Sequence, residues 1–414
     1  MENYISAIEI SDTEIRLAVG YVRENKINLI HVSQRPIIGL VSHGDINDFQ
    51  TLSSIIASMK EFKDETTKEK ITINEASLVL PSLGLNVFQS SKTTNVVSPY
   101  SLIAQIDIEN VINLVQKEAI PNGSEIVDII PDSFVLEKGR SFINPPINEK
   151  SNNITVKAKI HTLPGHIVSD YKRVLEKAGI KVRRMCVNSY AICELAKYSE
   201  DIPQSFILVD IGADITNVTL IGNSAPFETI TFPSGAAALI NKVGEKFGLV
   251  YADALDLIAK YGLDERPLSY KPVIATTFTN GLQTEHDPES LNMLIKDFFN
   301  KEYFDRFDVA FDTLMKGYPE HVRNLPIVFA GGLTKMFGFD GLVKNKFRSN
   351  ASIHYLEPTC IGARDTTYSA IIGAIFASSK YKGSLSDTRQ KSNQLERNKN
   401  DKEWIGERLC TMTV

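Results

Sequence analysis

The sequence has little cysteine, and the cysteines that it has form no pattern. Its four cysteines, Cys186, Cys193, Cys360 and Cys410, show neither metal-ligand spacing nor a disulfide framework. This excludes small disulfide-stabilised secreted domains and fits a reducing cytoplasm. Long apolar runs are also lacking. The longest, around Ala370 to Ala377, is far below the roughly 20 residues that a membrane-spanning helix needs, so we expect no helix to cross a bilayer.

Strong positive charge and a leader segment are absent as well. A net charge of -5 gives no reason to expect a nucleic-acid partner. The first residues show no basic region followed by an apolar stretch, so we expect no secretory signal. The chain does have 414 residues, of which 43% are hydrophobic and 23% charged, enough for about two or three globular domains.

One stretch organises the rest of the chain: Phe206 to Gly222, FILVDIGADITNVTLIG. It predicts a buried apolar strand that ends at Asp210 and Gly212, turns, and leaves as a second apolar strand. A glycine turn beside a carboxylate suits a phosphate or Mg²⁺, because a backbone N–H can approach an anion where no Cβ intervenes. The same pattern also fits a hairpin that binds nothing.

The N-terminus looks like a second copy of this hairpin. Tyr4 to Gly20, YISAIEISDTEIRLAVG, runs as an apolar strand into Glu9, then a short polar turn, then an alternating strand that closes on glycine. An internal duplication of this kind predicts two related lobes that hold something between them.

Other segments complete the expected organisation. Residues 83–163 predict a small inserted α+β unit, with a helix from Asp107 to Ala119 and strands that include Glu125 to Ile130 and Asp132 to Leu136. We expect a helix over Asp48 to Lys63 and a helix from Gly165 to Ala178 that Gly179 ends. A helix capped by Ser234 should end at Gly248, and a helix from Tyr251 to Tyr261 should end at Gly262. A helical zone from Glu289 to Lys316 has an expected break near Asn300, and a buried helix from Thr366 to Ser378 follows. LPIVFAGGL, Leu325 to Leu333, predicts a strand that ends in a glycine turn.

The end of the chain differs in composition. Lys380 to Asn400 is polar and predicts a disordered linker. After it, Trp404, Ile405, Leu409 and Met412 fall on one side of a predicted short helix that also carries Arg408. Residues 380–414 hold eight Lys/Arg and five Asp/Glu, a balance of +3 that suits a helix lying in a membrane surface. A frayed end whose tryptophan docks on its own core is the alternative.

Two acid-tipped hairpins, a later Gly-Gly turn and a final buried helix, in this order, resemble the actin, Hsp70 and sugar-kinase superfamily. Within it, nearly the whole chain resembles the FtsA family. The matching segments are Asp210 to Gly212, TITFPSGAAALI from Thr229, Ala330 to Leu333, and Glu357 to Gly373. The inserted unit in the first lobe, with Pro131, Phe134, Asn144 and Pro145, and the basic tail also match.

This resemblance implies an α/β, actin-like two-lobed fold of duplicated ribonuclease-H-like domains with a small α+β insert in the first lobe. It divides the chain into a first-lobe core (1–82 and 164–204), the insert (83–163), a second-lobe core (205–233 and 325–379, its final helix returning to the first lobe), an upper subdomain (234–324), a linker (380–400) and a membrane-targeting segment (401–414).

The resemblance also implies a function. FtsA proteins bind ATP between the lobes, polymerise like actin, and tether the tubulin-like FtsZ to the cytoplasmic face of the membrane at the division site. The positions that match the phosphate hairpins, the helix over the nucleotide and the adenosine turn are Glu9, Ser11, Asp12, Thr13, Asp210, Gly212, Ala213, Asp214, Thr216, Gly235, Gly331, Gly332 and Leu333, with Glu9 and Asp210 also as Mg²⁺ candidates. Arg306 matches a basic residue that contacts the acidic C-terminal peptide of FtsZ, a contact that Arg suits.

The two hairpins depart from the family pattern. The first has Glu9 where the family has Asp, Ser11 where it has Gly, and an additional Asp12. The second has Ala213 and Asp214 in place of two glycines. Extra carboxylates repel a triphosphate unless Mg²⁺ lies between them, so we expect ATP binding to be weakened and hydrolysis weak or absent.

Two rival functions share the fold. One is an actin-like platform protein of a pilus or secretion system, similar to PilM, which usually lacks a long basic tail. The other is a small-molecule kinase, which needs an intact phosphate loop and a carboxylate base and is disfavoured by the altered hairpins.

Overall fold

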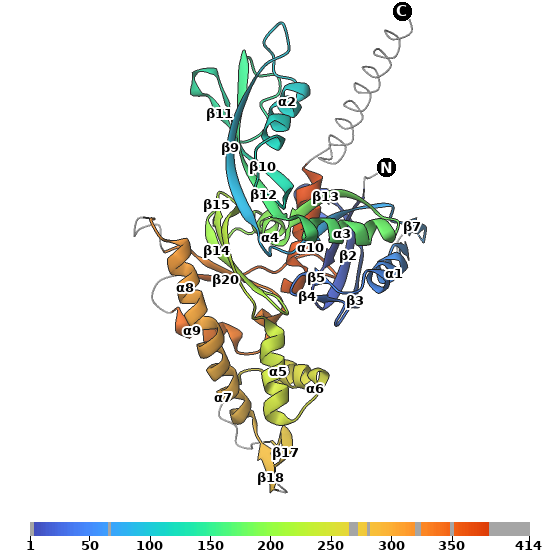
Figure 1. The fold of residues 1–414 in the computed structure, drawn as a ribbon, viewed down its shortest axis with the longest axis vertical. Coiled ribbons are helices and arrows are strands. Elements are labelled where there is room, and N and C mark those ends of the chain that lie inside the picture. The colour runs from blue at the N-terminus through green and yellow to red at the C-terminus, as the bar shows by residue number, and fades with distance from the viewer. Residues whose placement is uncertain are drawn as a thin grey trace, which may run out of the picture.

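The computed structural model describes residues 4–64, 68–264, 272–279, 282–318, 324–347 and 352–380, which form two lobes and a projecting unit (Figure 1). Within these residues, no helix is both long enough and apolar enough to pass through a membrane. The predicted linker and the membrane candidates Trp404, Ile405, Arg408, Leu409 and Met412 lie outside the described residues.

The first lobe is built on a five-stranded sheet. Its order is β3 (Lys26–Pro36), β2 (Glu14–Arg23), β1 (Ile5–Ile10), β8 (Glu75–Leu80) and β13 (Lys181–Val187). β1, β2 and β3 are antiparallel, and β8 and β13 run parallel to β1. The first predicted hairpin is therefore β1 and β2, with Glu9 directly opposite Arg16.

The second lobe repeats this sheet. Its order is β16 (Ala225–Phe232), β15 (Thr216–Gly222), β14 (Phe206–Ile211), β19 (Ile327–Ala330) and β20 (Ile353–Tyr355), with the same directions. Strand order and direction agree in all five positions, which confirms the predicted duplication. The sequence prediction had overlooked β16.

The inserted unit has a sheet and a core of its own. Its strands are ordered β11 (Ser141–Phe142), β10 (Ser124–Leu136), β12 (Asn153–Pro164) and β9 (Asn86–Asn95), and α2 (Gln105–Gln116) packs on them. The prediction that the chain forms two separate strands on either side of Pro131 is wrong. Both segments form the single strand β10, because irregularities in its register with β12 accommodate the proline without ending the pairing.

Helices cover the first sheet. α1 (Phe49–Met59) begins after Asp48, whose carboxylate accepts hydrogen bonds from Gln50 and Thr51. It ends earlier than predicted, because residues 61–63 form β6 (Glu61–Lys63), which pairs with β7 (Lys70–Thr72). α3 (Gly165–Lys177) ends as predicted at Gly179, which has φ +74°. The small hairpin of β4 (Val41–Ser42) and β5 (Asp45–Ile46) also belongs to this lobe.

The upper part of the second lobe is helical. α5 (Ala236–Phe247) and α6 (Tyr251–Tyr261) end at Gly248 and Gly262, as predicted. The predicted Ser234 cap is wrong, since Gly235 is the residue that precedes α5. The expected break near Asn300 is a π-helical turn (Phe299–Phe304) between α7 (Pro288–Phe298) and α8 (Asp305–Leu314). The hairpin β17 (Ala275–Thr279) and β18 (Leu282–His286) and the helix α9 (Phe339–Lys346) were not predicted.

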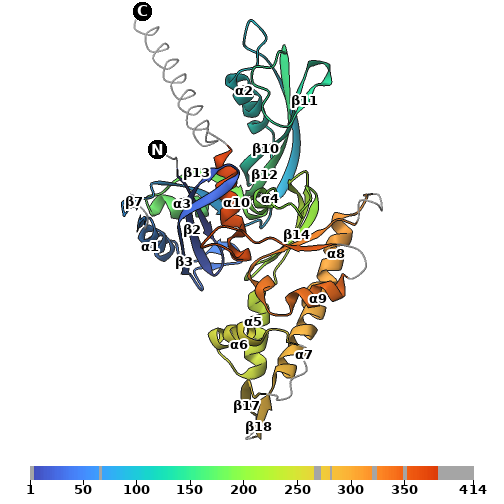
Figure 2. The same ribbon diagram turned by 180° about the vertical axis from the view of Figure 1, so that it is seen from behind.

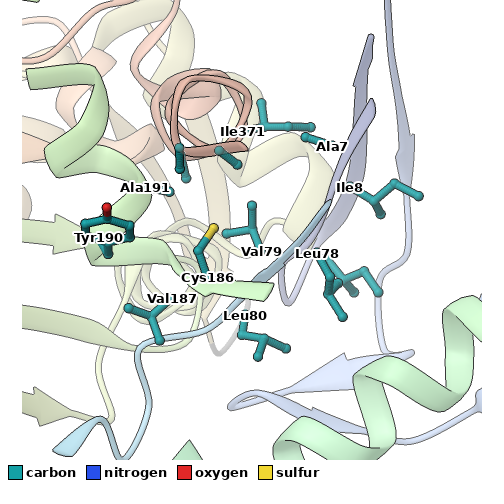
Figure 3. Close-up of a cluster of buried hydrophobic side chains, with 14 of the residues drawn as sticks. Ala7, Ile8, Leu78, Val79, Leu80, Cys186, Val187, Tyr190, Ala191 and Ile371 are labelled. Atoms are coloured by element: carbon teal, nitrogen blue, oxygen red, sulfur yellow. The ribbon is translucent and has the colours of Figure 1, made fainter. Parts of the chain in front are cut away.

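The final helix joins the lobes. α10 (Ser369–Ser379) packs against β1, β2, β8 and α4 (Asn188–Ala196), and Figure 2 shows it from behind, beside the first sheet. Gly373 makes this packing close, because a Cβ there would lie 1.8 Å from the Ala191 carbonyl oxygen. Figure 3 shows the side chains that meet at this point, among them Ala7, Val79, Cys186 and Ile371.

Strands of the second sheet contribute to both hydrophobic cores, and β14 shows this most clearly. On β14, Phe206 and Leu208 belong to the core that contains α4 and α10, whereas Ile207, Val209 and Ile211 belong to the core of the second lobe. Alternate side chains of a strand point to opposite faces of its sheet, so β14 is buried on both sides, as its apolar sequence predicts.

Candidate functional site

The turn of the first hairpin closes on itself. The Ser11 hydroxyl donates to the Glu14 carbonyl at 3.0 Å and accepts from the Glu14 amide at 3.1 Å. The Thr13 carbonyl accepts from the Ile37 amide at 2.8 Å, which ties the turn to the end of β3. Ser11 and Thr13 therefore hold the turn in place through contacts with their own lobe.

The turn of the second hairpin rests on the start of α5. The amides of Ala236 and Ala237 donate to the carbonyls of Gly212 and Ala213, each at 2.9 Å. A Cβ on Gly235 would lie 2.2 Å from the Ala213 carbonyl oxygen, so this approach requires glycine. Buried Thr216 donates to the Ser234 carbonyl at 2.6 Å. Two amides at the helix N-terminus are thus bonded to the turn.

The two turns meet through carboxylates. Asp12 accepts a hydrogen bond from the Gly44 amide at 3.0 Å, and Asp214 accepts one from the His43 amide at 3.4 Å. Burial raises the pKa of Asp12 and so does the Asp214 charge, whereas the backbone amides of Gly44 and Asp214 act in the opposite direction. The second bond joins the lobes, because His43 belongs to the first lobe and Asp214 to the second.

A buried cluster of charges lies behind the turns. Arg16 of β2 lies 3.5 Å from Glu9 of β1 and donates to Glu14 at 2.5 Å, and its guanidinium faces the Tyr368 ring at 5.9 Å. Glu9 and Arg16 are 6% and 8% exposed, so each needs the other's charge. Burial raises the pKa of Glu9, against the effect of Arg16.

Asp210 extends this cluster across the lobes. Burial raises its pKa to about 7, and the charge of Glu9 adds to the effect, whereas Arg16 opposes it. The structure thus brings the two predicted acids into electrostatic contact. Arg16, which supplies the positive charge between them, was not predicted. One feature of the sequence could have identified Arg16. It is a charged residue within the otherwise apolar strand of residues 14–22, at the position that faces Glu9.

The paired glycines after β19 have different roles. Gly331 has φ +93°, and a Cβ there would lie 2.1 Å from the Ile211 carbonyl oxygen. Its own carbonyl accepts hydrogen bonds from the Thr334 and Thr366 hydroxyls at 2.8 and 3.2 Å. Gly332 has more room, since its nearest neighbour would be the Thr367 methyl at 3.4 Å, and Leu333 is buried. The close packing of β14 and β19 therefore accounts for Gly331.

Arg306 lies apart from the two turns, on α8 of the second lobe. It donates to Glu302 at 2.9 Å, and its guanidinium lies 5.7 Å from the centre of the Phe232 ring. Its side chain remains 40% exposed, which leaves it accessible to a partner.

The contacts of the two turns oppose the binding of a Mg²⁺-bound triphosphate between the lobes. The His43 and Gly44 amides are bonded to Asp214 and Asp12, and the first amides of α5 are bonded to carbonyls. Like charges roughly 4 Å apart repel by about 4 kcal/mol at an effective dielectric constant of about 20, so each carboxylate opposes a phosphate. Among the described residues no group of three or more His, Cys, Asp or Glu side chains could hold a metal ion.

Comparison with known proteins identifies the class. No family model matches the chain. A structure of the PilM–PilN type IV pilus biogenesis complex superimposes with a TM-score of 0.60 at 14% identity, covering 91% of this chain and 98% of that chain. MreB 5 of Spiroplasma citri bound to AMPPNP gives a TM-score of 0.51 at 12% identity, covering 97% and 99%. These likenesses establish the fold, and the protein is a two-lobed member of the actin-like class.

Sequence comparison is more specific. The cell division protein FtsA of Bacillus subtilis (strain 168) is 22% identical over 384 residues, which cover 90% of this chain and 83% of FtsA. FtsA proteins of Streptococcus pneumoniae and Neisseria meningitidis match over similar spans. The chain is a relative of FtsA, an actin-like cell-division protein, which confirms the predicted resemblance.

Proposed function

We propose that this protein is a cell-division scaffold that polymerises and tethers FtsZ filaments to the cytoplasmic face of the membrane at the division site. The observation that carries the proposal is the similarity to FtsA over about nine tenths of the chain. The inserted unit, which follows β8 and precedes α3, is the element on which the sequence resemblance to FtsA also rests.

FtsZ recognition is assigned to the exposed side of α8. Arg306 offers a guanidinium that is 40% exposed and forms a surface ion pair with Glu302 four residues earlier. Such a pair contributes little to stability, so an acidic peptide can replace Glu302 at low cost. A charge-assisted hydrogen bond from Arg306 to a peptide carboxylate then makes the binding free energy more favourable.

The test is a binding titration with the acidic C-terminal peptide of FtsZ. We expect Arg306→Glu to weaken binding at least tenfold. Lys301→Glu is the matched control, because Lys301 is also exposed and paired with an acid four residues earlier, Asp297. Equal binding by the wild type and the Arg306 variant, or no binding by either, would reject this assignment. Absence of binding would instead favour a PilM-like platform, which the TM-score of 0.60 with the PilM–PilN structure supports.

Self-association is assigned to the two ends of the molecule. Large apolar side chains are exposed on the insert, where Tyr100 is 76% and Ile143 82% exposed, and on the β17–β18 hairpin, where Phe278 is 73% and Leu282 72% exposed. These units lie at opposite ends of the molecule (Figure 1). Different patches at opposite ends favour head-to-tail contacts, which generate open filaments. Tyr100→Ser and Phe278→Ser should each reduce pelleting of filaments, and unchanged pelleting would contradict the assignment.

Membrane attachment is assigned to the C-terminal segment with Trp404. The last described residue, Lys380, is bonded to buried Glu194 at 2.5 Å, which fixes the point where the tail leaves the first lobe. One short amphipathic helix binds lipid marginally, but a polymer adds many such anchors. Co-sedimentation with liposomes should be lost in a chain that ends before Lys399. Equal sedimentation of both chains would exclude this role.

Nucleotide plays a reduced part in this proposal. ATP would enter the cleft by displacing the contacts of Asp12 and Asp214, so we propose weak binding with little or no hydrolysis. Calorimetric titration with ATP and Mg²⁺ tests this directly. Tight binding with steady phosphate release would contradict it.

A further inference from the structure

We propose that Asp12 and Asp214 substitute for bound phosphate and clasp the two lobes together, so that the closed cleft needs no nucleotide. This inference concerns the cleft alone. It stands or falls independently of FtsZ, filaments and membrane.

The clasp begins at a pair of backbone amides that point toward the cleft. His43 and Gly44 form the two-residue turn between β4 and β5, and both have positive φ, +51° and +81°. Positive φ at both positions is the geometry of a tight hairpin turn, and it presents the two neighbouring amides to the anions beside them. Gly44 suits this conformation, whereas His43 adopts it although it carries a Cβ.

Each amide is bonded to a carboxylate from a different lobe. Gly44 donates to Asp12 at 3.0 Å within the first lobe, and His43 donates to Asp214 at 3.4 Å across the cleft. The Asp214 charge raises the pKa of Asp12 and the Asp214 amide lowers it, so the two turns lie close enough to interact. Carboxylate oxygens bonded to turn amides occupy donors of the kind that bind phosphate oxygens in other proteins.

Behind the clasp, Arg16 supplies a positive charge to the buried acids Glu9 and Asp210. It faces Glu9 at 3.5 Å and interacts favourably with Asp210 of the other lobe. A buried carboxylate is stable only when charge or hydrogen bonds compensate it. The chain therefore provides both the anions and the cation of a loaded cleft from its own side chains.

Distance measurements between spin labels on the two lobes test the clasp. Ser58→Cys on α1 and Ala259→Cys on α6 place labels at exposed positions on either side of the cleft, in a chain where Cys360 and Cys410 are changed to Ser. The full-length protein should give one narrow distance distribution without nucleotide, and ATP with Mg²⁺ should leave it unchanged. Asp12→Ser/Asp214→Gly should broaden the distribution and strengthen ATP binding about tenfold, because two repelling charges are removed.

A control variant lacks two carboxylates that lie elsewhere on the surface. Glu24→Gly/Asp256→Ser removes two exposed carboxylates outside the cleft and should behave like the wild type. A wild-type distribution that is broad and narrows only with ATP would overturn the proposal, and so would a variant as narrow as the wild type. If the double variant does not fold, Asp214→Gly alone should give the same broadening, since it removes the carboxylate that bonds across the lobes.

Discussion

The two hairpins at the centre of the molecule have the same topology but different charge compensation. In β1 and β2, Glu9 lies opposite Arg16, and in β14 and β15, Asp210 lies opposite Asn217. Asn217 accepts a hydrogen bond from Thr231 at 2.6 Å and brings no charge. Arg16 thus compensates the acid of its own lobe and also acts on the acid of the other. The two hairpins therefore share their strand arrangement, but the positive charge that acts on both acids comes from the first hairpin alone.

Removing Arg16 should lower the free energy of unfolding more than any other change to the two hairpins. Arg16→Ala leaves buried Glu9 without its partner, and breaking a buried ion pair in this way costs about 3–5 kcal/mol of the free energy of unfolding. Urea denaturation measures it. Arg23→Ala is the control on the same strand, because Arg23 is exposed and its contact with Glu24 is 3.9 Å long. Equal losses for the two variants would show that Arg16 is not the compensating charge.

The residues that follow the paired acids at the ends of β8 and β19 differ between the lobes, and this difference allows a second test. By register, Leu80 of the first lobe corresponds to Gly331 of the second, since Glu9 pairs with Val79 and Asp210 with Ala330. Gly331→Ala should cost roughly 2–4 kcal/mol, because φ is +93° and the Cβ would meet the Ile211 carbonyl. Gly332→Ala should be nearly neutral. Thermal unfolding distinguishes them, and a neutral Gly331→Ala would contradict the packing explanation.

Asp210, whose cross-strand partner Asn217 is neutral, should make stability depend on pH. The pKa of Asp210 is raised from 3.8 to about 7, so between these values the folded state keeps a proton that the unfolded state has lost. Stability should therefore fall as pH rises from about 4 to 7 and then level off, by up to about 4 kcal/mol from this residue. Asp210→Asn should flatten the curve. An equally steep curve in the variant would assign the effect to other groups, such as Glu9 and Asp12.

The neutral partner in the second hairpin should matter least. Asn217→Ala removes the acceptor of the Thr231 hydroxyl, and we expect a loss of about 1 kcal/mol, the usual contribution of such a bond. Urea denaturation beside Arg16→Ala gives the contrast. A loss as large as that of Arg16→Ala would remove the asymmetry between the hairpins.

The sequence predicted the two-lobed fold, because strand periodicity and the repeated acid-tipped hairpin are local patterns. It also predicted where three helices, α3, α5 and α6, end, through Gly179, Gly248 and Gly262. It predicted one strand break too many at Pro131, since pairing with β12 outweighs the local preference of proline.

The site was only partly predictable. Glu9, Asp12, Asp210 and Asp214 were predicted to contact nucleotide, and this stays a prediction. Their contacts in the structure depend on pairs far apart in sequence, such as His43 with Asp214. Arg16 and the His43–Gly44 turn acquire their roles only when the lobes are assembled. The roles of Arg306 and of the C-terminal segment stay predictions.

The two-sided burial of β14 has a consequence for how the protein can be divided. A chain cut between residues 204 and 205 would leave α4 without Phe206 and Leu208, and would also separate α10 from the strands β1, β2 and β8 that it covers. The core of the first lobe would be divided between the fragments, whereas the core of the second lobe would stay within the C-terminal one. Fragments expressed together should therefore complement each other only if Phe206 and Leu208 of β14 and the helix α10 can pack against the first lobe again.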